Sequence, residues 1–190
     1  MSEMAGKLDQ TGALEQLAQA VTEGKLSSAA RQNIEKWLKE TRYRKFQAAV
    51  IEHIGQAKWK QLDDAFWTVI PFGPGGRRGR MYPIGSNTIN DRTIGESAAG
   101  LAEYVRQTGS ANGELSCAIA YDTRHNSRVY AELCARIMVA NGFRVYFLDG
   151  FRSTPELSFL VRFKHCDCGI MVTASHNPPS DNAVKVYLST

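Results

Sequence analysis

Apolar residues recur with different periods in two parts of the chain. Residues 1–66 carry apolar side chains at helical spacing, as at Leu14, Leu17 and Ala18, and contain no proline. Apolar residues at positions i, i+3 and i+4 form one face of an amphipathic helix. The pattern predicts a helical N-terminal extension of three helices over residues 1–66, followed by a second domain over residues 67–190.

The segment from Val69 to Arg92 is rich in glycine and proline, which favours loop over regular structure. Within it, residues 72–80 interleave glycines with three arginines. Backbone N–H groups beside glycines can cradle an anion, and guanidinium groups add fixed N–H donors. The glycine spacing and terminal Lys-Ser/Thr of a P-loop are missing. An RNA-binding Arg/Gly patch is the alternative, but the segment is short and lacks interleaved aromatic residues, so we predict no nucleic-acid partner.

Beyond residue 92, short apolar runs alternate with amphipathic helical patterns. Strands are predicted at residues 116–121, 143–148, 168–173 and 184–188, with helices capped by Thr93, Ser127 and Ser153 between them. Strand–helix–strand units favour a parallel sheet with helices on both faces. We therefore predict a three-layer α/β/α domain with a mostly parallel mixed sheet. The fourth strand follows a short connection and is expected to be antiparallel, at the edge or beside the third.

Three predicted parallel strands would end at one edge of this sheet, where open α/β sheets bind their ligands. Arg124 and Arg152 follow the first two strands, and Ser175 follows the third. Two arginines would thus flank an anion held near a serine oxygen. Lys185, on the fourth strand, is expected to point to the face opposite Val184, near the serine loop.

Composition narrows the class of protein only slightly. The 190 residues are 43% hydrophobic, which suffices for a sizeable core, and the formal net charge of +4 is that of an ordinary surface that could also suit a phosphorylated ligand. No apolar stretch reaches the length of a membrane span, and the polar N-terminus is unlike a signal peptide. The four cysteines lack the density of a disulfide scaffold. We predict a cytoplasmic protein with no membrane partner.

Two chemical interpretations of Ser175 remain open from the residues alone. A hydrolase nucleophile is disfavoured, because the G-x-S-x-G elbow is absent and the adjacent His176 is poorly placed to accept the serine proton. A serine that carries a phosphoryl group would need cations and N–H donors around it. Alternatively, Ser175 only forms hydrogen bonds within its own loop.

Three motifs together resemble the α-D-phosphohexomutases, the superfamily of phosphoglucomutase and phosphomannomutase. The run from Thr173 to Pro178, followed by Asp181-Asn182 and Lys185, resembles their active-site serine loop. The glycine segment ending at Arg78-Gly79 is similar to their N-terminal loop, and Tyr121–Ser127 to their first strand, loop and helix start. These motifs fall in family order over the whole first domain. The helical extension looks more like the phosphoglucomutase/phosphopentomutase branch.

The resemblance implies that Ser175 carries a phosphoryl group and passes it to a hexose or pentose phosphate, through a sugar bisphosphate that also acts as activator. Lys185 and His176 match candidate acid/base or charge-stabilising residues, and Arg78 matches the arginine beside the transferring phosphate. The expected phosphate- or substrate-binding residues are Arg124, Arg152 and Asn177. The resemblance also implies Mg²⁺, bound partly through the phosphate on Ser175, with most ligands from another domain.

The sequence departs from the family pattern at two positions and in extent. Ala183 stands where the family usually has glycine, and Pro74 replaces a usual threonine or serine. Family members have four domains, and no motif of the later three is present here. We therefore expect the remaining mutase domains in cis, and expect this chain alone to fold without mutase turnover. The alternative is a non-catalytic phosphosugar-binding or interaction module of the same fold.

Overall fold

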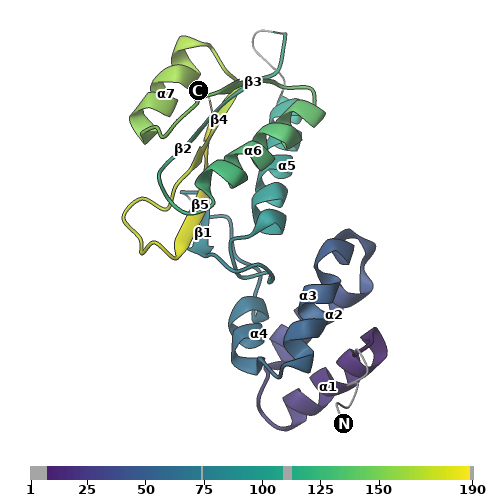
Figure 1. The fold of residues 1–190 in the computed structure, drawn as a ribbon. Coiled ribbons are helices and arrows are strands. Elements are labelled where there is room, and N and C mark those ends of the chain that lie inside the picture. The colour runs from purple at the N-terminus through teal and green to yellow at the C-terminus, as the bar shows by residue number, and fades with distance from the viewer. Residues whose placement is uncertain (1–7, 74, 109–112, 189–190) are drawn as a thin grey trace, which may run out of the picture. The chain divides into compact units, whose positions relative to one another are not determined.

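The computed structural model describes residues 8–73, 75–108 and 113–188 (Figure 1). They divide into two compact units. The first comprises the described residues up to Val69 together with Ile84–Thr88. The second comprises Ile70–Pro83 and the described residues from Ile89 onward, and it contains every residue of the predicted site.

The first unit is helical, with one helix more than the three predicted from the sequence. Its elements are α1 (Gln10–Thr22), α2 (Ser28–Lys39), a 3₁₀ turn η1 (Thr41–Tyr43), α3 (Arg44–Gly55) and α4 (Trp59–Phe66). Ala57 takes a φ of 50°, which separates α3 from α4. Trp37 is at the centre of the unit: its ring stacks on Tyr43 at 4.7 Å and meets Phe66 edge-on at 5.2 Å between centroids.

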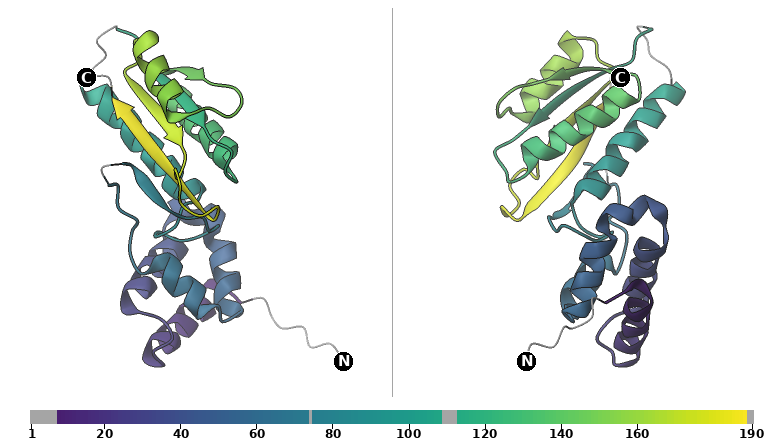
Figure 2. Two further views of the ribbon diagram at one scale, coloured as in Figure 1. Left: turned by 90° about the vertical axis from the view of Figure 1, so that its left-hand side faces the viewer. Right: turned by 45° about the vertical axis from the view of Figure 1, so that its right-hand side comes forward.

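The second unit is a three-layer α/β/α domain, which confirms the predicted fold class (Figures 1 and 2). Its strands are β1 (Arg77–Arg80), β2 (Ser116–Tyr121), β3 (Arg144–Phe147), β4 (Cys168–Val172) and β5 (Asp181–Leu188), in the order β1-β5-β4-β2-β3. Strands β3, β2 and β4 are parallel, and β5 is antiparallel to both β4 and β1. Two helices, α5 (Asp91–Thr108) and α6 (Ser127–Ala140), cover one face, and α7 (Thr154–Phe163) covers the other.

Strand β1 corrects the prediction that residues 69–92 form only loop. Arg77 pairs with Val184 and Arg80 with Asp181, so β1 is an edge strand and β5 is internal. The strand has a single non-arginine residue, Gly79, and so lacks the apolar alternation that signals a strand. Charged residues on an edge strand discourage pairing with other chains, which suits this composition.

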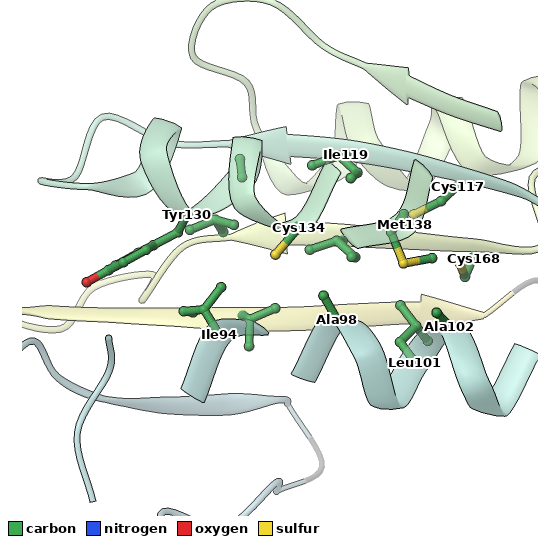
Figure 3. Close-up of a cluster of buried hydrophobic side chains, with 14 of the residues drawn as sticks. Ile94, Ala98, Leu101, Ala102, Cys117, Ile119, Tyr130, Cys134, Met138 and Cys168 are labelled. Carbon is green, nitrogen blue, oxygen red and sulfur yellow. The ribbon is translucent and has the colours of Figure 1, made fainter. Parts of the chain in front are cut away.

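The main core lies between the sheet and the α5–α6 layer (Figure 3). Ile94 and Ala98 of α5 meet Cys134 and Met138 of α6 above strand residues such as Ile119, and all five are buried. Fully burying a larger side chain such as that of Ile94, Ile119 or Met138 contributes about 1.5–3 kcal/mol. All four cysteines are free and buried, and burial raises the pKa of Cys134 to about 12.

A second, smaller cluster lies under α7. Ala118, Ala120 and Met171 face the Leu157 and Val161 side chains of the helix. Successive strand residues point to opposite faces, so each strand divides its residues between the two clusters. This assignment of faces decides where the candidate site residues point.

Two of the predicted helix caps need correction. At α7 the capping box is present: Ser153 Oγ accepts from the Glu156 amide, and the Glu156 carboxylate accepts from the Ser153 amide at 2.7 Å. At α5 the cap is Asn90, whose Oδ1 accepts from the Thr93 amide at 3.1 Å while Thr93 Oγ1 accepts from the Asn90 amide at 3.0 Å. Thr93 is therefore the reciprocal partner rather than the cap.

The start of α6 differs in a way that matters for the site. Ser127 is the first helical residue, and Asn126 before it takes a left-handed φ of 61° without a side-chain cap. The Ser127 hydroxyl donates instead to Asp122 Oδ1 at 2.7 Å. The predicted cap is thus part of the loop network after β2.

Within the described ranges, no helix combines the length and apolarity that crossing a membrane requires.

Candidate functional site

The carboxyl ends of the three parallel strands meet at one edge of the sheet, as predicted. The Asp122 amide donates to the Val172 carbonyl at 3.2 Å, joining the ends of β2 and β4. The Arg152 amide donates to the Tyr121 carbonyl at 2.9 Å, joining the loop after β3 to the same place. Residues from segments far apart in the sequence therefore converge on the loop that carries Ser175.

Ser175 is exposed on a loop that is fixed from both sides. Its amide donates to Thr173 Oγ1 at 3.0 Å, and the Asn177 amide donates to the Ala174 carbonyl at 3.1 Å. The Thr173 amide donates in turn to the Ala183 carbonyl of β5 at 3.1 Å. Ser175 takes a φ of 58°, a left-handed conformation that costs a non-glycine residue about 1–3 kcal/mol. The surrounding hydrogen bonds hold it there.

Arg124 lies behind this loop with its guanidinium turned toward backbone carbonyls. Nη1 and Nη2 donate to the carbonyls of Ser175 (2.7 Å), Asn177 (2.6 Å), Pro178 (2.7 Å) and Asp181 (3.2 Å). Nε lies 3.4 Å from Asp122 Oδ2, and the side chain is only 11% exposed. The phosphate-binding role predicted for Arg124 stays a prediction; the contacts that the structure gives it are to the loop itself.

A chain of buried polar groups ties the loop after β2 to the start of β5. Ser127 Oγ donates to Asp122 and accepts from Asn182 Nδ2 at 3.0 Å. The same amide group donates to the His125 carbonyl at 2.9 Å, while Asn182 Oδ1 accepts from the Ala183 amide at 2.8 Å. Asn182 is fully buried, so each of these bonds satisfies a group that water cannot reach.

Arg78 and Lys185 share one face of the sheet. Arg78 lies opposite Ala183, and Lys185 lies opposite Met171, a member of the cluster under α7. Residues opposite each other, or two apart along a strand, point to the same face. Both cations therefore point to the α7 side, and in the part of the chain that the structure describes neither side chain forms a hydrogen bond or an ion pair. Arg77, on the other face, donates to the Thr93 carbonyl and to Glu96.

Gly76 brings the glycine-rich loop before β1, called the first loop below, into direct contact with β5. It takes a φ of 97°, and a Cβ at this position would lie 2.1 Å from the Val184 carbonyl oxygen and 2.9 Å from the Lys185 Cα. Only glycine permits this approach. The close contact fixes where β1 starts, and with it the position of Arg78 beside β5.

A shallow polar hollow of about 330 Å³ adjoins Ser175. Its lining consists of Asp122, Thr123, Arg124, His125, Ser175, Asn177 and Pro179. Thr123 and His125 were absent from the predicted site residues, although their position directly after β2 could have indicated them.

Comparison with known proteins assigns this architecture to a family. The family described as phosphoglucomutase/phosphomannomutase, alpha/beta/alpha domain I, matches residues 70–190. The chain belongs to this family. This confirms the suspected phosphohexomutase resemblance.

Individual relatives agree with the family match. A phosphoglucomutase of Staphylococcus epidermidis is 40% identical over 120 residues, which cover 63% of this chain and 21% of that protein. A phosphoglucomutase of Staphylococcus haemolyticus is 38% identical over 125 residues, covering 66% and 22%. The crystal structure of a "putative phosphomannomutase" from Thermus thermophilus superposes with a TM-score of 0.57 at 29% identity, covering 64% and 26%. The chain thus spans about a fifth of the length of the curated phosphoglucomutases it matches.

The three remaining predicted site residues, His176, Asn177 and Arg152, differ in how close they lie to Ser175 and the hollow. His176 Nδ1 lies 3.4 Å from Ser175 Oγ, a long hydrogen bond between neighbours. Asn177 lines the hollow, and its Nδ2 donates to Asp181 Oδ2 at 2.9 Å. Arg152 stands at the same sheet edge but does not line the hollow; its Nη1 donates to the Phe151 carbonyl at 3.0 Å, and its Nε lies 3.9 Å from Glu156.

The departures from the family pattern leave the strand pairing in place. Ala183 is fully buried in β5, and its carbonyl still accepts from Thr173. Pro74 lies outside the described residues.

The described residues do not form a complete magnesium site. No group of three or more histidine, cysteine, aspartate or glutamate side chains is placed there to hold a metal. The carboxylates of the loops around Ser175 already have partners. Asp122 accepts from Ser127 and Arg124, and Asp181 accepts from Asn177 and Ser180. A phosphate on Ser175 would add one ligand, so these residues do not fit the metal by themselves.

Proposed function

We propose that this chain is the domain of a phosphosugar mutase that carries the transferable phosphoryl group on Ser175. The observation that carries the proposal is the pairing of an exposed serine with unused cations. Ser175 is exposed at the end of β4, and the adjoining strands present Arg78 and Lys185 on one face without partners among the described residues. Membership of the phosphoglucomutase/phosphomannomutase family supports the same chemistry.

The proposed reaction consists of two phosphoryl transfers, one from Ser175 to the sugar phosphate and one back to Ser175. A hydroxyl oxygen of the sugar phosphate attacks phosphorus and passes its proton to a base, while the bond from phosphorus to Ser175 Oγ breaks and Oγ takes up a proton to become a hydroxyl. The sugar bisphosphate then returns its other phosphoryl group to Ser175 by the reverse step. Lys185 and Arg78 would neutralise charge on the transferring oxygens, and His176 or Lys185 would move the proton.

Further domains are part of the proposal. Because the chain spans about a fifth of its curated relatives, we propose that other domains in cis supply sugar recognition and the remaining magnesium ligands. We expect hexose or pentose phosphates as substrates, with a sugar bisphosphate as activator, and a cytoplasmic location, which the free buried cysteines support. The 190-residue chain alone is expected to fold without catalysing mutase turnover.

The test is phosphoryl transfer to Ser175. The gene is expressed at its natural length, and the protein is incubated with glucose 1,6-bisphosphate and weighed intact. We expect one phosphoryl group on the unmodified protein and on Ser180→Ala, a control in the same loop, but none on Ser175→Ala. An equal gain on Ser175→Ala, or none on the unmodified protein, would reject the proposal. Phosphosugar binding without any gain would favour the non-catalytic module instead.

A further inference from the structure

We propose that Arg124 is a positioning residue that holds the carbonyls of the serine loop inward, so that Ser175 and the amide of His176 face outward. Its catalytic consequence rests on the proposed function, because the outward groups would meet the phosphoryl group carried by Ser175. The loop geometry itself does not depend on that function and can be measured separately.

The guanidinium contacts a loop that lies far from Arg124 in the sequence. Arg124 donates to four carbonyls that lie 51 to 57 residues further along the chain. Nη2 serves Ser175 and Asn177, and Nη1 serves Pro178 and Asp181. A planar guanidinium presents its donors as a rigid fork, so it can satisfy two pairs of acceptors at once.

The loop needs a cation at this point because its carbonyls converge. The segment Asn177-Pro178-Pro179 has only one backbone N–H, since proline has none. Its carbonyl oxygens therefore outnumber the donors that the segment itself can supply. Converging carbonyl dipoles repel one another and would also repel a phosphate. A buried positive charge behind them removes both effects.

The same contact orients the peptide bond after Ser175. All the described peptide bonds are trans, and in a trans peptide the C=O and N–H point in opposite directions. Because the Ser175 carbonyl points at Arg124, the His176 amide points away from it. That amide donates to no acceptor within the described residues. It is therefore available to a phosphoryl oxygen on the adjacent Ser175 side chain.

Asp122 holds Arg124 through contacts that do not involve the serine loop. Its Oδ1 accepts from the Arg124 amide at 3.0 Å and from Ser127, and its Oδ2 lies 3.4 Å from Arg124 Nε. With the arginine side chain 11% exposed, the guanidinium has little freedom to turn toward solvent. This arrangement explains how Ser175 is kept at a φ of 58°.

The test is Arg124→Lys, with Arg128→Lys as the matched control, because Arg128 is exposed and its ion pairs are with Glu132 and Asp149, away from the serine loop. Lysine keeps the charge, but one ammonium nitrogen cannot serve both pairs of carbonyls. Amide hydrogen exchange of the 190-residue chain is measured by NMR. In Arg124→Lys we expect the amides of Asn177 and Asp181 to exchange at least about ten times faster than in the parent chain. The exchange rates of the β4 amides should stay within about twofold of the parent values. The three-bond HN–Hα coupling of Ser175, which reports its positive φ, should change as well.

Unchanged loop exchange and an unchanged Ser175 coupling in Arg124→Lys would overturn the proposal. If that variant does not fold, Asp122→Asn provides the test, because it leaves the guanidinium in place but removes the charge that fixes it. We then expect a smaller rise in loop exchange, and no rise would again overturn the proposal.

Phosphorylation of Ser175 in the natural-length protein separates this proposal from the proposed function. Faster loop exchange with no phosphorylation of any variant would leave the loop-holding role intact and reject the mutase. Normal phosphorylation with unchanged loop exchange would do the reverse. If the loop-holding role and the mutase function are both correct, Ser175 should be phosphorylated at least about tenfold more slowly in Arg124→Lys than in Arg128→Lys.

Discussion

The two sides of the candidate site differ in whether their arginine and lysine side chains have partners in the protein. The Arg124 side chain is 11% exposed, and its guanidinium contacts four carbonyls of the serine loop and the Asp122 carboxylate. Across β5 and β1, the Lys185 and Arg78 side chains point from one face and form no hydrogen bond or ion pair within residues 8–188 as described.

The difference separates a cation that supports the loop from cations that are open to a ligand. A cation whose donors are all satisfied stabilises the loop but has little left to offer a ligand. Cations without partners leave a positive surface that an anion can neutralise. This is why the proposed function assigns support of the serine loop to Arg124, and assigns contact with the phosphoryl group to Arg78 and Lys185.

The face that carries Lys185 and Arg78 is called the open side below, and the face with the Arg124–Asp122–Asn182 contacts is called the tied side. The largest effect is expected on the open side, from Lys185→Gln. Removing one group that stabilises charge in phosphoryl transfer should lower the rate of Ser175 phosphorylation by about 10²–10³-fold. Thermal stability should barely change, since Lys185 has no partner to lose among the described residues. Quenched-flow phosphorylation of the natural-length protein gives the rate. Lys60→Gln, on the exposed surface of α4, is the control. A rate loss smaller than about threefold would place Lys185 outside the reaction.

Gly76→Ala should break the contact that positions the open side. Its Cβ would meet the Val184 carbonyl at 2.1 Å at a φ of 97°, so the first loop must move away from β5. We expect a loss of about 3 kcal/mol in the free energy of unfolding, measured by urea denaturation. Gly75→Ala is the matched control, because a Cβ there meets nothing within 4 Å. Equal stability of the two variants would contradict the role given to Gly76.

Asn182→Ala should weaken the tied side. The change removes three hydrogen bonds in a fully buried position and leaves the His125 carbonyl and the Ala183 amide unsatisfied. A loss of about 2 kcal/mol in unfolding free energy is expected. Ser180→Ala, on the exposed part of the same loop, should change it by less than about 0.5 kcal/mol. Similar values for the two variants would show that the buried network contributes little.

The smallest effect concerns the core beneath both sides. Burial raises the pKa of Cys134 from 9.0 to about 12, so the folded chain holds this thiol proton more tightly than the unfolded chain. This contribution is complete below pH 9 and is lost as pH rises toward 12. Near pH 9.5 the loss should be roughly 1 kcal/mol relative to Cys134→Ala. Parallel stability curves for the two proteins across this range would contradict it.

Local sequence signals predicted the features that depend on neighbouring residues. The Ser153–Glu156 capping box is local and is present in the structure. The buried strands β2 and β4 are continuous apolar runs, which made their parallel pairing and the α/β/α fold predictable. The convergence of Arg124, Arg152 and Ser175 on one sheet edge follows from that topology alone.

Features that depend on distant residues could not be predicted in this way. Strand β1 has no apolar pattern, and it is a strand because its backbone pairs with β5 about a hundred residues later. The contacts of Arg124 with the serine loop could not be foreseen, because the carbonyls it binds lie more than fifty residues further along the chain. Ser127 looked like a helix cap, but its hydroxyl is used by Asp122 and Asn182.

The most direct test of the comparison is the pKa of a phosphate placed on Ser175. Phosphoserine is introduced at position 175 of the chain, and its second ionisation is followed by ³¹P NMR. Nearby cations favour the dianion, so we predict a pKa below the usual value of about 6, raised by either Lys185→Gln or Arg78→Gln and unaffected by Arg128→Lys. A pKa at or above the usual value that neither variant changes would contradict the account, because the phosphate would then lie away from the open cations.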